Sequence, residues 1–425
     1  TPLPSNPLTL KPPTQALRAG SANTPIYPSA MLPPFSRRTP LAWLNLTHDR
    51  RRFVTSLGGV GFAVLLMFLF TGFKNALYDS QVQLINQLNG DIVIINRLKN
   101  NMFVPRAFAR RRLYQAQAFP GVEAAYPVYL SDVRWKNPVT QQARPVRVVA
   151  FNLADPVLTL PEVQANLAAL QMPNTALIDE RARAEVGPRE AGIITELADR
   201  EIRIVGTFRL GTDFASGNGN LIMSDQNFLR YFADRGPEES DRSFATADIG
   251  LIRVSPGVDV DALVAQLQAA LPNDVRVMRR SGPGDSLEAQ EREYWRDSTN
   301  IAFVFSLLTA MSFVVGIILV YQILYTDVAD HWAEYATLKA MGYTNRFLFG
   351  VVIQEALILS ALGFIPGALV GRLLYGGAAS VTGLLFQMTV DRVLTLYAMC
   401  FVMCLISGAI AVHKVQSADP AEVFS

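Results

Sequence analysis

Four long, almost charge-free stretches constrain this chain more than any other feature of its sequence. They are residues 53–73, 300–326, 347–372 and 393–412. Inside them the only ionisable side chain of the Asp, Glu, Lys and Arg types is Glu355, apart from Arg372 at an end. Each has about 20 to 27 residues, and about 20 helical residues cross the ~30 Å hydrocarbon layer of a bilayer. We therefore predict an integral membrane protein with four transmembrane helices.

The composition agrees with this prediction. Hydrophobic residues make up 50% of the 425-residue chain and charged residues only 17%. The 38 basic and 36 acidic residues nearly cancel, so no global field would attract nucleic acid. The only two cysteines, Cys400 and Cys404, are spaced to share one helix face, where they act as small hydrophobic residues.

The arginines set the orientation. Arg37, Arg38 and residues 50–52 crowd the N-terminal side of the first span, and basic residues favour the cytoplasmic side. We therefore assign to the cytoplasm the N-terminal segment, residues 327–346 and the C-terminal tail 413–425. The segments outside the cytoplasm are residues 74–299 and the short connection 373–392. The Pro-rich residues 1–39 are expected to be disordered, and residues 40–52 form a cytoplasmic amphipathic segment. About fifty residues precede the first span and no small-x-small cleavage pattern follows it, which indicates a retained anchor.

The outer segment 74–299 mixes strand and helix patterns. The predicted strands are Asp91–Asn96, Arg144–Phe151, Glu201–Phe208, Ile249–Val254 and Asp274–Met278, and the predicted helices are Arg106–Ala118, Ser224–Phe232 and Val260–Leu271. The fold class is thus a membrane protein with a large α+β periplasmic domain between the first and second spans. Residues 74–89 and 285–299 are predicted to be stalk helices that extend the spans; the alternative is ordinary surface helices.

Small residues recur at helix-packing spacing within three spans. They are Gly59 and Ala63; Ala302, Ser306 and Ala310; and Gly363, Gly367 and Gly371. Such rows let helix backbones approach closely in lipid. Since four spans are few for a translocation unit, we predict a homodimer in contact with membrane lipids.

No catalytic or metal-binding pattern is present. The outer segment has no histidine, because the three histidines are His48, His331 and His413, and neither a nucleophile elbow nor a zinc motif occurs. The glycine-rich segment Gly211–Gly219 lacks the pattern of a phosphate-binding loop, so a hairpin or a partner-contact loop is the better interpretation. We predict no enzyme activity, metal or cofactor on this chain.

The segment between the second and third spans has a distinctive sequence. Residues 327–346 predict a short amphipathic helix that lies along the inner membrane face and ends at Gly342, since a residue without Cβ suits a helix C-cap. The third span then carries Glu355-Ala356-Leu357, and the chain closes with Asp419-Pro420-Ala421-Glu422.

These residues resemble the FtsX/MacB permease superfamily. Glu334, Leu338, Ala340 and Gly342 match its pattern after the second span, although Lys339 replaces the usual Arg. Two segments look most like the corresponding sequences of DevC-type permeases: residues 331–343 and Pro-Leu-Ala-Trp-Leu at 40–44. The resemblance implies that residues 327–346 hold a coupling helix that docks into an ABC ATPase. The implied coupling residues are Glu334, Tyr335, Leu338, Lys339, Ala340, Met341, Gly342, Asp419 and Pro420.

The resemblance also implies the partners. Because no Walker A stretch occurs in this sequence, ATP and Mg²⁺ are expected on a separate, DevA-like ATPase. A DevB-like adaptor and a TolC-like outer-membrane channel would complete an inner-membrane exporter of a lipid-like or amphiphilic substrate such as a glycolipid. The alternatives are an FtsX-like scaffold that activates a cell-wall hydrolase and a lipoprotein-release permease. The large outer domain favours the exporter over the scaffold.

Glu355 is an unusual residue for a span. It lies about 12 Å into the third helix, where an ionised carboxylate costs several kcal/mol unless it is paired or protonated. A proton pathway and a structural hydrogen bond both explain it, and the second is the better interpretation.

Overall fold

The computed structural model describes residues 41–102, 104–213, 216–232, 245–297 and 300–416. The predicted tail 1–39 and the predicted coupling residues Asp419 and Pro420 lie outside the described residues.

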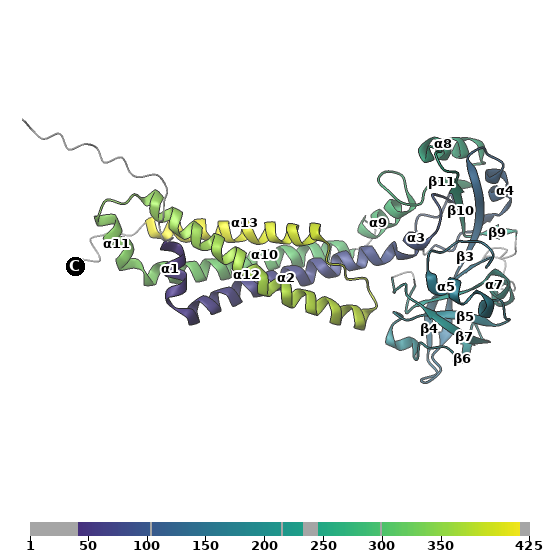
Figure 1. Cartoon of the computed structure of the whole chain (residues 1–425), viewed down its shortest axis with the longest axis horizontal. Helices are drawn as coiled ribbons and strands as arrows, with labels where there is room; N and C mark the ends of the chain where they lie inside the picture. The colour runs from purple at the N-terminus through teal and green to yellow at the C-terminus, as the bar shows by residue number, and fades with distance from the viewer. Residues whose placement is uncertain (1–40, 103, 214–215, 233–244, 298–299, 417–425) are drawn as a thin grey trace, which may run out of the picture. The chain divides into compact units, whose positions relative to one another are not determined.

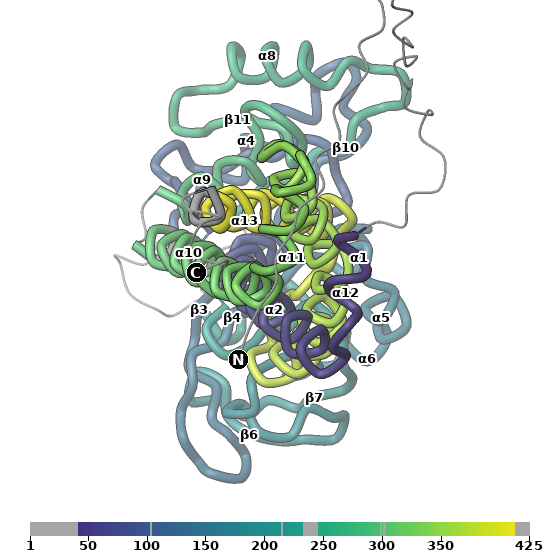
Figure 2. Tube along the Cα trace, turned by 90° about the vertical axis from the view of Figure 1, so that its left-hand side faces the viewer, coloured from purple at the N-terminus to yellow at the C-terminus, as the bar shows by residue number. Residues whose placement is uncertain are grey.

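Four helices within the described residues are long and apolar enough to cross a membrane. They are α2 (Arg50–Gln81), α10 (Asn300–Asp330), α12 (Asn345–Thr382) and α13 (Val390–Gln416). Figures 1 and 2 show them side by side, with α2 packed on α10 and α12, and α13 packed on the same two helices. A mixed domain of helices and strands follows α2 and precedes α10, which confirms the predicted fold class.

The glycines of the third span bring α12 against α2. A Cβ on Gly363 would lie 2.6 Å from Val60 Cγ1, and one on Gly367 would lie 2.6 Å from the Gly61 carbonyl oxygen. Gly371 faces Phe68 in the same way. This row therefore packs two helices of the same chain.

The other predicted rows differ in their surroundings. Gly59 of α2 approaches Ile323 of α10, and Ala63 is fully buried. Ser306 and Ala310 of α10 are exposed on the surface of the described chain; the side chain of Ala302 is outside the described part. The α10 row thus remains available for lipid or for a second chain.

Several helix boundaries differ from the predicted ones. Residues 373–382 belong to α12, so the predicted outer connection 373–392 shrinks to residues 383–389. The charge of Arg372 ends the apolar run but does not end the helix, which stops at Gly383 with φ +71°. Residues 327–330 likewise belong to α10, and the helix predicted from Asp327 is α11 (Trp332–Ala340).

Short helices flank the bundle. The amphipathic segment forms α1 (Leu41–His48), and Asp49 caps α2 by accepting hydrogen bonds from the N–H groups of Arg51 and Arg52. The predicted stalks are helical: α2 continues to Gln81 and is followed by α3 (Gln83–Gln87), and α9 (Leu287–Asp297) precedes α10.

The outer domain is built on one large sheet. Within the described residues its strand order is β11-β1-β10-β3-β4-β8-β5-β7-β6, with parallel pairs β4–β8 and β5–β7 and antiparallel neighbours elsewhere. The strands are β1 (Ile92–Asn96), β3 (Val122–Lys136), β4 (Ala143–Phe151), β5 (Thr175–Asp179), β6 (Ile194–Leu197), β7 (Arg200–Phe208), β8 (Asn220–Ser224), β10 (Ile249–Val254) and β11 (Val275–Arg279). A small second sheet pairs β2 (Phe108–Ala109) with β9 (Thr246–Ala247).

Helices cover this sheet. They are α4 (Arg111–Gln117), α5 (Pro161–Ala165), α6 (Leu167–Leu170), α7 (Asp225–Phe232) and α8 (Val260–Ala270), with a 3₁₀ turn at Ala184–Val186. Ser224 caps α7 as predicted, since its hydroxyl accepts from the Asn227 N–H. The helix predicted from Arg106 begins only at Arg111, because residues 108–109 pair as β2.

Candidate functional site

The end of α11 is shaped by a glycine. The Gly342 N–H donates to the Lys339 carbonyl and the Tyr343 N–H donates to the Leu338 carbonyl, which together form a Schellman motif. Gly342 has φ +94°, a conformation that a side chain would strain. The chain thereby leaves α11 abruptly and enters α12 at Asn345.

The described coupling residues fall into three groups by exposure. Glu334, Ala340, Met341 and Gly342 are exposed, Leu338 and Lys339 are half-buried, and Tyr335 is buried. Beside them Tyr343 is also exposed. Met341 is 63% exposed and Tyr343 is 45% exposed, so the end of α11 presents apolar surface that nothing in the described chain covers.

Tyr335 lies on the side of α11 that packs against the bundle, whereas the predicted coupling role would need an exposed side chain. Its side chain is only 5% exposed and packs among Ala42, Val352 and Val412. The amphipathic pattern placed it on a helix face but could not tell which face the bundle would cover. Burial, followed by the nearby Glu355 carboxyl, raises the pKa of the Tyr335 phenol above its usual range, so the phenol stays neutral.

Asn45 of α1 contacts both α11 and α12. Its Nδ2 donates to Glu355 Oε1 at 3.2 Å and lies 3.4 Å from the Tyr335 hydroxyl oxygen. Glu355 itself has no exposed surface. The Glu355 carboxyl is therefore hydrogen-bonded inside the bundle near its inner end, the arrangement that the structural interpretation expects. No sequence pattern predicts a role for Asn45, whose only signal is a lone amide beside the apolar residues Ala42 and Leu46 of α1.

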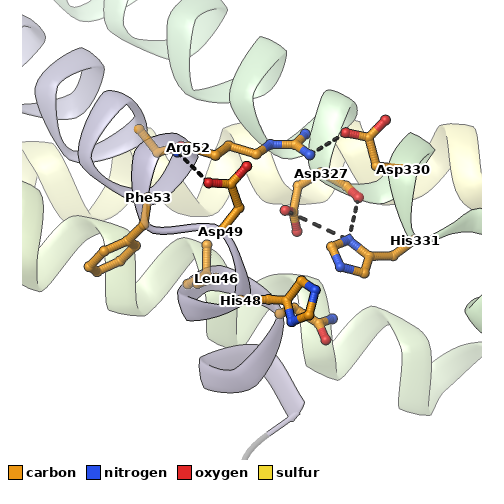
Figure 3. Close-up of a pocket in the computed structure, with 10 residues that line it drawn as sticks. Leu46, His48, Asp49, Arg52, Phe53, Asp327, Asp330 and His331 are labelled. Carbon is orange, nitrogen blue, oxygen red and sulfur yellow. Dashed lines mark hydrogen bonds and ion pairs between the residues drawn. The ribbon is translucent and has the colours of Figure 1, made fainter.

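A cavity of about 200 Å³ opens beside these residues, between α1, the start of α2 and the end of α10 (Figure 3). Arg52 of α2 forms an ion pair with Asp330 of α10 across it. His331 Nδ1 lies 2.9 Å from the backbone oxygen of Asp327 and 3.9 Å from its carboxylate. These contacts fix the turn that leads from α10 into α11.

Met341 and Tyr343 form the exposed apolar surface at the end of α11, which is the candidate docking surface. Among the described residues no group of three or more His, Cys, Asp or Glu side chains could hold a metal ion. Polar contacts join α1 with α11 and α12, and join α2 with α10. These contacts hold the neighbouring helices in place, and the end of α11 remains exposed and apolar.

Two family models match the chain. The MacB-like periplasmic core domain matches residues 54–270 and the FtsX-like permease C-terminal model matches residues 306–420. Among curated proteins, the macrolide export ATP-binding/permease protein MacB of Nitrobacter winogradskyi is 28% identical over 142 residues, which are 33% of this chain and 22% of that protein. The chain thus matches about a fifth of the length of this relative.

Three solved structures match part of this chain at low identity and low TM-score. The periplasmic region of MacB from Actinobacillus actinomycetemcomitans has 12% identity and a TM-score of 0.32, covering 46% of this chain and 90% of that one. The extracellular domain of the transporter YknZ from Gram-positive bacteria has 9% identity and a TM-score of 0.30, covering 44% and 99%. A permease domain from Porphyromonas gingivalis has 18% identity and a TM-score of 0.29, covering 47% and 95%.

Proposed function

Since this chain belongs to the FtsX/MacB superfamily of ABC-transporter permeases, we propose that it is the membrane subunit of a tripartite exporter driven by an ATPase on a separate chain. It is a multi-pass inner-membrane protein with a periplasmic domain. In this proposal ATP binding moves the inner ends of the helices, and the helices transmit that motion to the periplasmic domain.

The exposed end of α11 carries the proposal. Met341 and Tyr343 are large apolar side chains left in contact with solvent, which is the kind of anchor that protein partners bury. The Schellman turn holds both in place and Tyr335 fastens the helix to the bundle. A partner ATPase that binds the end of α11 would also move α12, because only residues 341–344 separate α11 from α12.

The remaining partners are proposed from the DevC-type resemblance. They are a DevA-like ATPase that binds ATP and Mg²⁺, a DevB-like adaptor and a TolC-like outer-membrane channel. We propose a second copy of this chain as the partner of α10, where Ser306 and Ala310 are exposed. The proposed substrate is a lipid-like or amphiphilic molecule such as a glycolipid.

The docking surface is tested by placing a charge on it. Ala340→Glu adds an unpaired carboxylate to an exposed position that an ATPase would bury, so binding should weaken by roughly thirtyfold or more, the equivalent of about 2 kcal/mol or more. The measurements are copurification of the ATPase with the permease and permease-stimulated ATP hydrolysis.

Ala270→Glu is the matched control. Ala270 is also an exposed alanine at the last position of a helix, α8 of the outer domain, and its substitution should leave both readouts unchanged. Normal copurification together with normal stimulated hydrolysis in Ala340→Glu would reject this docking surface.

A further inference from the structure

A loop of the periplasmic domain contacts the connection between α12 and α13. The Thr212 N–H donates to the Gly383 carbonyl at 3.1 Å, and Thr212 Oγ1 donates to the Thr382 carbonyl at 3.1 Å. The domain therefore touches the outer end of α12, in addition to its covalent connections through α2 and through α9 and α10. We call the contact between Thr212, Thr382 and Gly383 the outer link.

Buried polar groups hold the loop that carries Thr212. The Asp179 carboxylate accepts hydrogen bonds from the N–H groups of Leu210 and Gly211 at 3.1 and 2.7 Å. Asn220 Nδ2 donates to the Gly211 carbonyl at 2.7 Å. On the other side of Thr212, Asp213 forms a fully buried ion pair with Arg147 of β4. Thr212 is thus fixed to the sheet on both sides.

Two glycines allow the close approach. Gly383 has φ +71°, and a Cβ there would lie 2.5 Å from the Arg181 carbonyl oxygen and 2.7 Å from Thr212 Oγ1. Gly211 has φ +110°, and a Cβ there would lie 3.1 Å from the Gly383 carbonyl oxygen. Side chains at either position would force the loop and the connection apart.

The same connection is joined to the outer end of α2. The Leu385 N–H donates to Ser80 Oγ at 3.0 Å. Asp79 forms ion pairs with Arg392 at 2.6 Å and with Arg292 of α9 at 3.1 Å. The connection is therefore held at the point where the domain meets the bundle.

Helix α12 joins this point to the docking surface. It begins at Asn345, shortly after the exposed end of α11, and continues for 38 residues to Thr382, with Pro366 inside it. At 1.5 Å per residue it spans about 57 Å. A displacement of α11 would reach Thr212 along one helix.

We propose that the outer link stays closed throughout the transport cycle and passes the movement of α12 to the periplasmic domain, with Thr212 as a positioning residue. The proposal rests on the proposed function, in which an ATPase moves α11. It adds a non-covalent route to the two covalent ones through α2 and α9–α10.

A cysteine pair tests whether the link stays closed. Thr212→Cys/Thr382→Cys leaves Gly383 unchanged and places the two thiols on residues that a 3.1 Å hydrogen bond joins, where oxidation can form a disulfide. The native Cys400 and Cys404 are fully buried in α13 and should not interfere. In the complex with the ATPase, the disulfide yield should agree within about twofold with and without ATP and vanadate. A yield that falls sharply on ATP binding would overturn the proposal.

A second experiment tests whether the link transmits movement. Spin labels on Cys at positions 270 and 303, both exposed, report the distance between the domain and α10 in the permease–ATPase complex. In Gly383→Leu the ATP-driven change in this distance should fall to less than about half, although the ATPase still binds and hydrolyses ATP. Gly377→Leu is the control, since a Cβ at Gly377 of α12 meets no atom within 4 Å.

If the ATP-driven change in the distance between the spin labels is as large in Gly383→Leu as in the unmodified chain, the covalent routes suffice. That result would reject the proposed role of the outer link. If Gly383→Leu fails to fold, Thr212→Ala replaces it, with Thr212→Ser as the conservative variant that should restore the movement. Failure of the proposed function is a separate result, because the unmodified chain would then not bind the ATPase at all.

Discussion

Glu291 of α9 is a carboxyl without exposed surface in the periplasmic domain. Its two oxygens accept hydrogen bonds from the Met102 N–H and from Trp295 Nε1, both at 2.8 Å. Burial nevertheless raises the pKa of Glu291 to about 7, because these two bonds offset only part of the lost hydration. Glu291 thus fastens α9 to the loop after β1 and makes that contact sensitive to pH.

The contribution of Glu291 to the stability of the protein should therefore fall as the pH rises from about 4.5 to about 7. In this window the folded state binds the Glu291 proton and the unfolded state has released it, so each rise in pH favours unfolding. The loss totals about 3 kcal/mol, in order of magnitude, and is complete above the folded pKa. Thermal unfolding in detergent at about pH 5 and about pH 8 measures it.

Glu291→Gln should flatten this slope, since the amide does not titrate. Glu293→Gln, at an exposed position of the same helix, should keep the wild-type slope. An undiminished slope in Glu291→Gln would assign the pH dependence to other groups.

At the scale of the elements, α12 depends on its glycines in two ways. Gly363 and Gly367 allow contact with α2, whereas Gly350, Gly376 and Gly377 face open space. The four-residue spacing of Gly363, Gly367 and Gly371 already marks the first group in the sequence. The contacts with Val60 and Val64 make the first group structural.

Gly367→Ala and Gly350→Ala should shift stability in opposite directions. A Cβ at Gly367 would lie 2.6 Å from the Gly61 carbonyl oxygen and 2.8 Å from Val64 Cβ, so the helices must separate at a cost of about 1–3 kcal/mol. At Gly350 the same change should stabilise by about 0.5–1 kcal/mol, because alanine restricts the unfolded chain. The thermal midpoints of both variants decide this, and equal shifts would contradict it.

At the scale of the whole molecule, the proposed homodimer predicts a particular cross-link. Ser306→Cys places a thiol on the exposed face of α10, and oxidation of native membranes should join two copies. Leu373→Cys is the control: it is 75% exposed near the outer end of α12 and should face lipid. Equal dimer yields from both positions would reject α10 as the specific interface.

The outer domain shows where prediction from sequence stops. β1, β4, β7, β10 and β11 lie within one or two residues of their predicted positions, because each is a short apolar run bounded by turn residues. The 15-residue β3 was missed, since Pro127 and Asp132 interrupt its apolar pattern. Its neighbours β10 and β4 supply the pairing that its own residues do not signal.

The sequence by itself determined the four spans and the glycine-terminated end of α11. Both depend on local physics: the free energy of moving an apolar run into lipid, and the backbone freedom of one glycine. Tertiary structure decided which groups meet. It turned Tyr335 inward, gave Glu355 a hydrogen bond from Asn45, and brought Thr212 to Gly383. Such contacts join residues far apart along the chain, so no local pattern can specify them.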